Sequence, residues 1–213
     1  MAVSRFFIYN EKYYPAGKAV IHVDNRSFRY GDGFFETMKL INGEIILCNL
    51  HFERLFSSMA MLQFDAPKYF TREKLESEIK ALAEKNKHSK LARIRLTVFR
   101  GDGGLYDAVS NHANYIIQTW EMNPANNEFN TNGLVTDIFT DARKACDSFS
   151  HIKSNNYLPY IMGALWARNN KLNDAFILNM HHRIADATIA NIFLVKDGLI
   201  QTPALSEGCV SGI

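Results

Sequence analysis

An asparagine-rich stretch, Glu121–Gly133, divides this chain of 213 residues into two parts. It holds an Asn-Pro pair, further asparagines and few apolar side chains, a composition typical of connecting segments. The whole sequence is 47% hydrophobic and 22% charged, which favours folded domains over disorder. We therefore expect two domains, residues 1–120 and 134–213, joined by a linker over residues 121–133, so that each part has to bury its own core.

The part before the linker mixes helix and strand patterns. Leu75, Ile79 and Leu82 recur at the spacing of one helix face, and Thr71 can serve as the N-cap of that helix. In chain order, the patterns predict strands at Lys18–Val23 and Glu44–Cys48, a helix at Leu50–Gln63, the helix after Thr71, and strands at Arg93–Phe99 and Tyr115–Trp120. The first domain is therefore expected to be of the α+β class.

The part after the linker is expected to be mostly β. The patterns predict a strand at Leu134–Phe139, a helix at Leu158–Asn170, and strands at Ala175–Asn179, Ile192–Val195 and Leu199–Thr202. The turn Lys196-Asp197-Gly198 indicates a hairpin between the last two strands. On the helix, the spacing of Ile161, Leu165 and Trp166 predicts that these three side chains face inward.

Charge and cysteine content exclude several classes of protein. The formal net charge is +2 and no run of lysine or arginine is long, so we expect neither a nucleic-acid nor a membrane partner, but small molecules. Cys48, Cys146 and Cys209 fit neither a disulfide framework nor a zinc site, and no metal is expected. With no secretion signal and no apolar stretch long enough to span a bilayer, the expected location is the cytoplasm.

Two residues in the second part could hold pyridoxal 5′-phosphate (PLP). Lys153 lies just before the predicted helix, in a weakly charged neighbourhood, and a PLP enzyme needs one lysine amine to tether the cofactor and carry a proton. Asp186 lies in an apolar stretch, where a carboxylate can bond the pyridine nitrogen. Taken alone, each has a simpler interpretation, because most lysines are exposed and aspartate is common in turns.

Three arginines in the first part are candidates for binding anionic groups. Arg54 has apolar neighbours on its helix, so it could face inward to a phosphate, although an exposed arginine paired with a glutamate is the commoner case. Arg93 and Arg95 alternate with apolar residues and project from one sheet face, where one of them could bind a substrate carboxylate. A solvated strand face explains that alternation equally well.

Taken together and in order, these motifs resemble the class IV aminotransferases. These are the fold-type IV PLP enzymes, which include branched-chain and D-amino-acid aminotransferases and 4-amino-4-deoxychorismate lyase. The matching residues are Tyr30-Gly31-Asp32-Gly33 with Phe35-Glu36, His51-x-x-Arg54-Leu55, Lys153 with Asn156, Ile184-x-Asp186 before Asn191-Ile192-Phe193, Lys196-Asp197-Gly198, and Thr202-Pro203 leading to Gly212-Ile213. The resemblance implies a two-domain α+β fold like that of D-amino-acid aminotransferase. It also implies that the C-terminal domain is incomplete in this chain, because the family continues past the Gly-Ile pair.

The resemblance implies a role for each matching residue. Lys153 would be the Schiff-base lysine, and Asp186 the partner of the pyridine nitrogen, one methylene shorter than the family's usual glutamate. Arg54 would bind the phosphate, together with the backbone at Val210, Gly212 and Ile213. Tyr30, Phe35 and Arg95 would contact the substrate. The enzyme would form a homodimer with its active sites near the interface.

The expected function is that of a PLP-dependent enzyme acting on an amino acid through an external aldimine. Transamination, with a 2-oxo acid as acceptor, is the first choice, and 4-amino-4-deoxychorismate lysis or PLP binding without catalysis are the alternatives. The specificity signals conflict. The Lys153-x-x-Asn156 spacing resembles the lyase and the D-amino-acid enzymes, but Leu105 stands where those have arginine, and Arg95 matches an arginine of the branched-chain enzymes.

Overall fold

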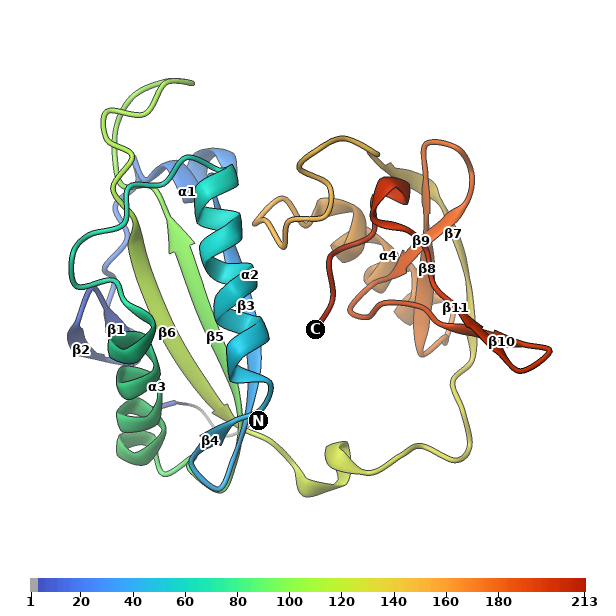
Figure 1. The fold of residues 1–213 in the computed structure, drawn as a ribbon, viewed down its shortest axis with the longest axis horizontal. Helices are drawn as coiled ribbons and strands as arrows, with labels where there is room; N and C mark the ends of the chain where they lie inside the picture. The colour runs from blue at the N-terminus through green and yellow to red at the C-terminus, as the bar shows by residue number, and fades with distance from the viewer. Residues whose placement is uncertain (1–3) are drawn as a thin grey trace. The chain divides into compact units, whose positions relative to one another are not determined.

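The structure is a computed structural model that describes residues 4–213 and forms two compact units. The first unit extends to Phe129 and the second comprises Asn130–Gly212. The division falls within the stretch expected to be the linker, where Pro124–Asn127 forms a short 3-10 helix. Each unit has a sheet of its own (Figure 1).

The first unit is built on a six-stranded antiparallel sheet with the order β2-β1-β6-β5-β3-β4. Its strands are β1 (Phe6–Tyr9), β2 (Lys12–Pro15), β3 (Gly33–Ile41), β4 (Glu44–Ile45), β5 (Leu91–Phe99) and β6 (Asn114–Glu121). Two helices, α2 (Cys48–Met61) and α3 (Arg72–Asn86), cover one face of the sheet, and a short helix, α1 (Arg26–Tyr30), precedes β3 (Figure 1).

The alternation of side chains along the strands separates the two faces of this sheet. On β5, Ala92, Ile94, Leu96 and Val98 are fully buried, on the face that the helices cover. The intervening side chains belong to the opposite face, which we call the open face. Across the central strands, the open face carries Phe35, Thr37 and Lys39 on β3, Arg93, Arg95 and Thr97 on β5, and Ile116, Gln118 and Trp120 on β6.

Several predicted elements of the first unit are confirmed. The hydroxyl of Thr71 accepts a hydrogen bond from the backbone N of Lys74 at 3.3 Å, so Thr71 is the N-cap of α3. Leu75, Ile79 and Leu82 are fully buried, as their spacing predicts. The two strands predicted from alternating residues are present as β5 and β6.

Two predicted strands are wrong in whole or in part. Residues 18–23 form no strand, and the chain turns where the N–H of Asn25 donates to the carbonyl of His22. The strand predicted over Glu44–Cys48 is only the two residues of β4, because Leu47 adopts a left-handed conformation with φ 53° and α2 begins at Cys48. At residues 18–23 the apolar content was right, but no neighbouring strand pairs with the backbone, whereas β4 pairs with β3 and ends where α2 begins.

The second unit combines a small mixed sheet with one helix. The sheet has the order β7-β8-β9, with β7 and β8 parallel and β8 and β9 antiparallel. Its elements are β7 (Thr136–Lys144), α4 (Leu158–Asn169), β8 (Asp174–Asn179) and β9 (Ile184–Ala187), followed by the hairpin strands β10 (Leu194–Lys196) and β11 (Leu199–Gln201) and a 3-10 turn at Leu205–Glu207. Because parallel strands need a crossover, α4 connects β7 to β8 and packs on both.

The inward face of α4 differs from the prediction. Tyr160, Gly163 and Ala167 are buried against the sheet, whereas Ile161 and Leu165 are exposed, so their predicted inward orientation is wrong within this unit. Trp166 is partly buried against the core, as predicted. Close approach at Gly163 sets this orientation, because a Cβ there would lie 2.7 Å from Cδ1 of Ile177.

An irregularity in β7 decides which of its residues point inward. The register with β8 shifts between Phe139 and Arg143, and both Phe139 and Lys144 are buried. In a regular strand these two side chains, an odd number of residues apart, would lie on opposite faces. The bulge therefore places a lysine in the interior of the second unit.

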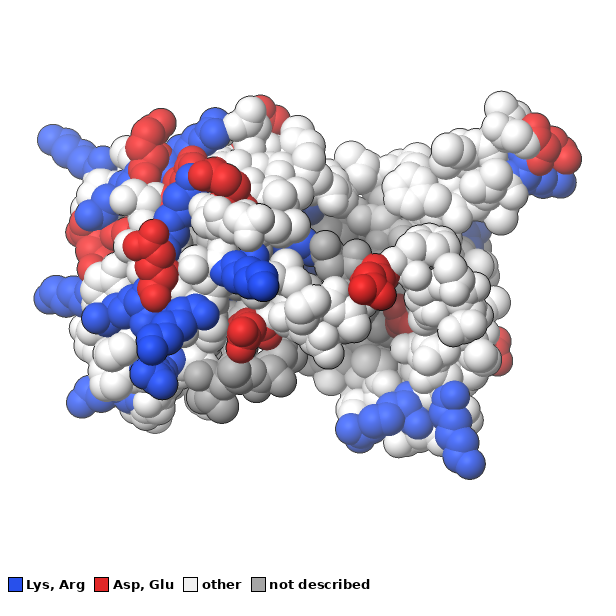
Figure 2. Space-filling model, turned by 90° about the horizontal axis from the view of Figure 1, so that it is seen from below, with Lys and Arg blue, Asp and Glu red and all other residues white. Residues whose placement is uncertain are grey.

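The surface of the described chain carries both signs of charge. On the face that Figure 2 shows, lysine and arginine side chains are interspersed with aspartate and glutamate. Across residues 4–213, none of the helices has the length and apolar content that crossing a bilayer requires.

Candidate active site

The buried carboxylate of Asp186 is the centre of a hydrogen-bonded cluster in the second unit. Its Oδ2 accepts from Lys144 Nζ at 2.8 Å, Tyr160 Oη at 2.7 Å and the backbone N of Val210 at 3.1 Å. Its Oδ1 accepts from Asn191 Nδ2 at 3.2 Å. Asp186 lies opposite Ile177 in the sheet, so both side chains point to the face that α4 covers. Asp186 as a residue is 2% exposed, so these bonds replace the contact of its carboxylate with water.

A second chain of contacts leads from this cluster to Lys153. Lys153 Nζ donates to Tyr157 Oη at 3.0 Å, and the Tyr157 ring packs against the Tyr160 ring at 4.6 Å between centroids. Burial, and then the negative charge of Asp186, raise the pKa of Tyr160, so its hydroxyl stays protonated and donates to Asp186. The two tyrosines, one helical turn apart at the start of α4, thus connect a lysine amine to a buried carboxylate.

A cavity of about 290 Å³ lies beside these residues. Its lining includes Lys144, Tyr157, Tyr160 and Val210, together with residues next to Lys153 in the chain. The cavity is therefore bounded by the partners of Asp186 and of Lys153.

The segment at the end of the chain lies against the same cluster. The N–H of Val210 donates to Asp186, and its carbonyl accepts from Asn191 Nδ2 at 2.8 Å. Gly212 follows, where a Cβ would lie 1.9 Å from Asn191 Oδ1, so any larger residue would have to displace the Asn191 side chain. Ile213 is the last residue of the sequence. The Val210 amide, expected on a phosphate, is instead bonded to Asp186.

In the first unit, Arg54 belongs to a buried ionic cluster between α2 and β3. Its Nε and Nη2 donate to the two oxygens of Glu36 at 2.6 Å each, and His51 Nδ1 lies 2.8 Å from Glu36 Oε2. The side chain of Arg54 is 13% exposed and that of Glu36 is 1% exposed. Arg54 therefore points inward and is held in one orientation by a two-pronged bond.

We expect acid to weaken the fold through Glu36. Burial raises the pKa of its carboxyl, but the bonds from Arg54 and His51 outweigh burial and leave the pKa below its ordinary value of 4.5. Such a group stabilises the fold above its unfolded pKa, and this contribution is lost as the pH falls through the folded pKa. The free energy of unfolding should therefore fall as the pH drops below about 4.5. Urea titrations from neutral to acid pH measure this.

Glu36→Gln should remove that acid-sensitive contribution. At neutral pH it should also cost about 3 kcal/mol, because Arg54 loses both bonds to a charged partner. If the free energy of unfolding depends on pH in the same way in the wild type and in Glu36→Gln, Glu36 is not the acid-sensitive group.

The three residues expected to contact substrate, Tyr30, Phe35 and Arg95, lie in the first unit as well. The Arg95 guanidinium lies 3.6 Å from the centre of the Phe35 ring, and its Nε donates to Thr97 Oγ1 at 3.2 Å, so two of the three residues are in contact on the open face. Tyr30 ends α1, with the guanidinium groups of Arg26 and Arg29 near its ring.

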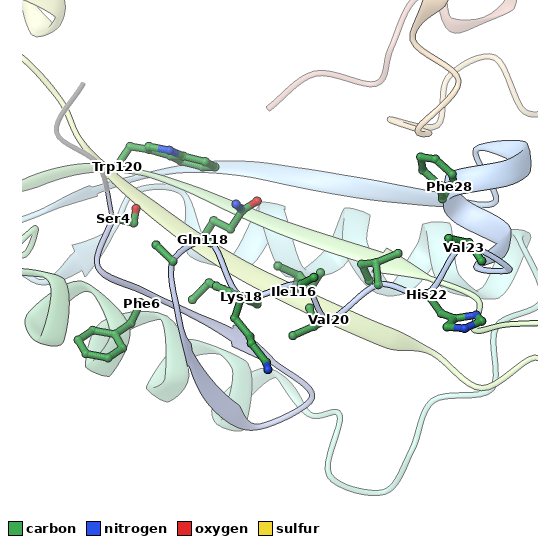
Figure 3. Close-up of a pocket in the computed structure, with 15 residues that line it drawn as sticks. Ser4, Phe6, Lys18, Val20, His22, Val23, Phe28, Ile116, Gln118 and Trp120 are labelled. Carbon is green, nitrogen blue, oxygen red and sulfur yellow. The ribbon is translucent and has the colours of Figure 1, made fainter.

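A larger cavity, of about 600 Å³, lies beside β6 on the open face (Figure 3). The segment wrongly predicted to be a strand runs along it through Lys18, Val20 and His22, with Trp120 and Phe28 at its two ends (Figure 3). Its lining is mainly apolar and contains none of the predicted site residues.

The predicted site residues thus fall into two sets. Arg54, Tyr30, Phe35 and Arg95 belong to the first unit, and Lys153, Asp186, Val210 and Gly212 to the second. Sequence reasoning missed several residues in contact with them, namely Glu36, His51, Lys144, Tyr157, Tyr160 and Asn191. Four of these lay inside or beside the motifs that it used, Tyr160 follows one turn after Tyr157, and Lys144 had no signal in the sequence. No cluster of three potential metal ligands occurs in the described residues.

Comparisons with known proteins agree on one family. Residues 33–213 match the family described as amino-transferase class IV. The chain is 24% identical to D-alanine aminotransferase of Listeria innocua and 26% identical to aminodeoxychorismate lyase of Bacillus subtilis. Each of these alignments covers 96% of this chain. It shares the fold of the branched-chain aminotransferase of Thermoproteus uzoniensis with a TM-score of 0.85, 24% identity and 99% of its residues covered. It spans 70%, 69% and 72% of these three chains, respectively.

Proposed function

The chain belongs to the class IV aminotransferase family, and we propose that it acts on an amino acid with PLP bound through Lys153, most simply as a transaminase. One observation carries this proposal. In the second unit, a lysine amine and a buried carboxylate are connected through Tyr157 and Tyr160.

The residues present fit the cofactor on which this family depends. PLP supplies an aldehyde that an amine can attack and a pyridine ring that withdraws electrons from the α-carbon of the substrate. Lys153 provides the amine, and Asp186 provides a carboxylate for the ring nitrogen. Arg54, fixed by Glu36, provides a guanidinium for the phosphate, with the backbone at Gly212 and Ile213.

Lys153 has two tasks in this proposal. Its Nζ would hold the cofactor, and in a second step it would accept the proton from the α-carbon of the substrate and return it. Tyr157 Oη, 3.0 Å from Nζ, holds the amine in place through both steps.

The most direct test starts with the purified protein and added PLP. Attachment should give the absorption of PLP on a lysine, and borohydride reduction followed by peptide mass spectrometry should find the label on Lys153. A panel of amino donors with 2-oxo acids, and of aminodeoxychorismate, then measures turnover. Absence of label on Lys153 would overturn the proposal, and label without any turnover would leave a PLP-binding protein.

The lyase is the second candidate activity. It is favoured by the likeness to the aminodeoxychorismate lyase of Bacillus subtilis. Both reactions begin with the same proton removal by Lys153, so the two candidates differ in the substrate side of the site. Release of pyruvate and 4-aminobenzoate in the panel would identify the lyase, and transfer of the amino group to a 2-oxo acid would identify the transaminase.

Arg95 is our candidate for the carboxylate of the substrate. Its guanidinium is held by Phe35 and Thr97, so it can bind an anion without first being ordered. Arg95→Gln should raise KM for amino acids roughly tenfold to a hundredfold with a small change in kcat, because the bond forms in ground and transition states alike. Arg93→Gln, on the same strand and face, is the matched control. Equal effects of the two variants on KM would contradict this role for Arg95.

We propose further that the enzyme is a cytoplasmic homodimer with active sites near the interface. The loop at residues 103–107 supports the dimer. The buried guanidinium of Arg26 donates to the carbonyls of Leu105, Tyr106 and Asp107 at 2.6, 3.0 and 3.3 Å, while the side chains of Leu105 and Tyr106 are exposed. An ordered loop that presents apolar side chains suits contact with a second copy.

A further inference from the structure

Lys144 and Asp186 form a buried ion pair beside the proposed cofactor site. Lys144 Nζ lies 2.8 Å from Asp186 Oδ2, and the two side chains are 8% and 3% exposed. The Lys144 ammonium also lies 5.1 Å from the centre of the Tyr160 ring. A charged donor bonds a carboxylate more strongly than a neutral one does, so Lys144 is the strongest of the partners that hold Asp186.

The two carboxylate oxygens of Asp186 differ in the number of hydrogen bonds that they accept. Each oxygen can accept about two hydrogen bonds. Oδ2 accepts from Lys144, Tyr160 and the Val210 amide, which fills it. Oδ1 accepts from Asn191 and has a lone pair for one more donor. A pyridine nitrogen that bonds Asp186 therefore has one oxygen to use.

We infer that Lys144 is a positioning residue that holds Oδ2 of Asp186 and so leaves Oδ1 to the cofactor's ring nitrogen. This inference rests on the proposed function. It gives Lys144 a role in the site that the sequence motifs did not indicate and that is separate from the proposed roles of Lys153 and Arg54. Without Lys144, Asp186 would keep only neutral donors, and its carboxylate could turn or take up a proton, because a buried charge is unstable without its counter-ion.

A double-mutant cycle tests whether Lys144 acts through Asp186. The four proteins are the wild type, Lys144→Met, Asp186→Asn and the double variant, in which neither buried charge is left alone. Lys144→Met should weaken PLP binding roughly tenfold in the wild type and less than about twofold in the Asp186→Asn background, a coupling within the range for residues in contact. Lys144→Arg, which keeps the charge, should stay within about threefold of the wild type.

A spectroscopic readout separates positioning from general loss of structure. With ¹⁵N-labelled PLP bound, the ring-nitrogen resonance should move in Lys144→Met, and Lys144→Met should cause no further shift in the Asp186→Asn background. Lys196→Met removes an exposed lysine of the same unit and should change neither the resonance nor the PLP affinity. If Lys144→Met does not fold, Lys144→Gln replaces it in the cycle, because glutamine keeps a donor without the charge.

The results of these two experiments either support or overturn the role of Lys144. Equal losses of PLP affinity in both backgrounds, or an unchanged affinity and resonance in Lys144→Met, would overturn it while leaving the proposed function intact. A wild-type protein that carries no PLP on Lys153 would overturn both.

Discussion

Lys153→Ala is expected to abolish covalent attachment of PLP and to lower turnover by on the order of a thousandfold or more, because the variant loses both the tether and the group that moves the α-proton. The fold should tolerate the change. Lys153 is only partly buried, and it donates a hydrogen bond to the hydroxyl of Tyr157, which lies at the start of α4 and can bond to water instead.

Three measurements test this expectation. They are the absorption of the PLP-treated protein, the site of borohydride labelling and the turnover rate with the best substrate. Lys196→Ala, on the exposed hairpin, is the matched control and should behave as the wild type. Addition of a small primary amine should restore part of the activity of Lys153→Ala, since the amine can carry the proton. Labelling of another lysine in the wild type, Lys144 included, would show that Lys153 is the wrong residue.

Asp186→Asn is expected to have two large effects. The chemical step should slow by on the order of a hundredfold, because the charge that stabilises electron withdrawal by the ring is lost. The protein should also lose about 3–5 kcal/mol of stability, because Lys144 remains buried without the carboxylate that it now contacts at 2.8 Å. Adding Lys144→Met should recover much of the stability and none of the rate.

Single-turnover kinetics and urea unfolding measure these two effects separately. Asp197→Asn, in the exposed turn of the β10–β11 hairpin, is the matched control, since its φ of 51° suits asparagine. Asp186→Glu keeps the charge and should lose less rate than Asp186→Asn. Wild-type chemistry in Asp186→Asn would mean that another residue serves the ring nitrogen.

Prediction from the sequence succeeded where a local pattern was sufficient. The spacing of Leu75, Ile79 and Leu82 and the cap at Thr71 specify α3, because a helix closes its hydrogen bonds within itself. The hairpin at Lys196-Asp197-Gly198 also forms as predicted, with φ of 51° and 77° at the last two residues. The strand predicted over residues 18–23 is wrong, because a strand requires a partner strand and apolar content does not reveal whether one is present.

Short motifs and their order in the sequence were sufficient to predict the family and the α+β class, and they named the candidate residues. What surrounds those candidates could be learned only from the folded structure. Asp186 meets Lys144 because an irregularity in β7 turns that lysine inward, and alternation along a regular strand predicts the opposite. It meets Tyr160 because the close approach of α4 at Gly163 sets which side of the helix faces the sheet. Both contacts depend on how elements pack, which residue spacing does not encode.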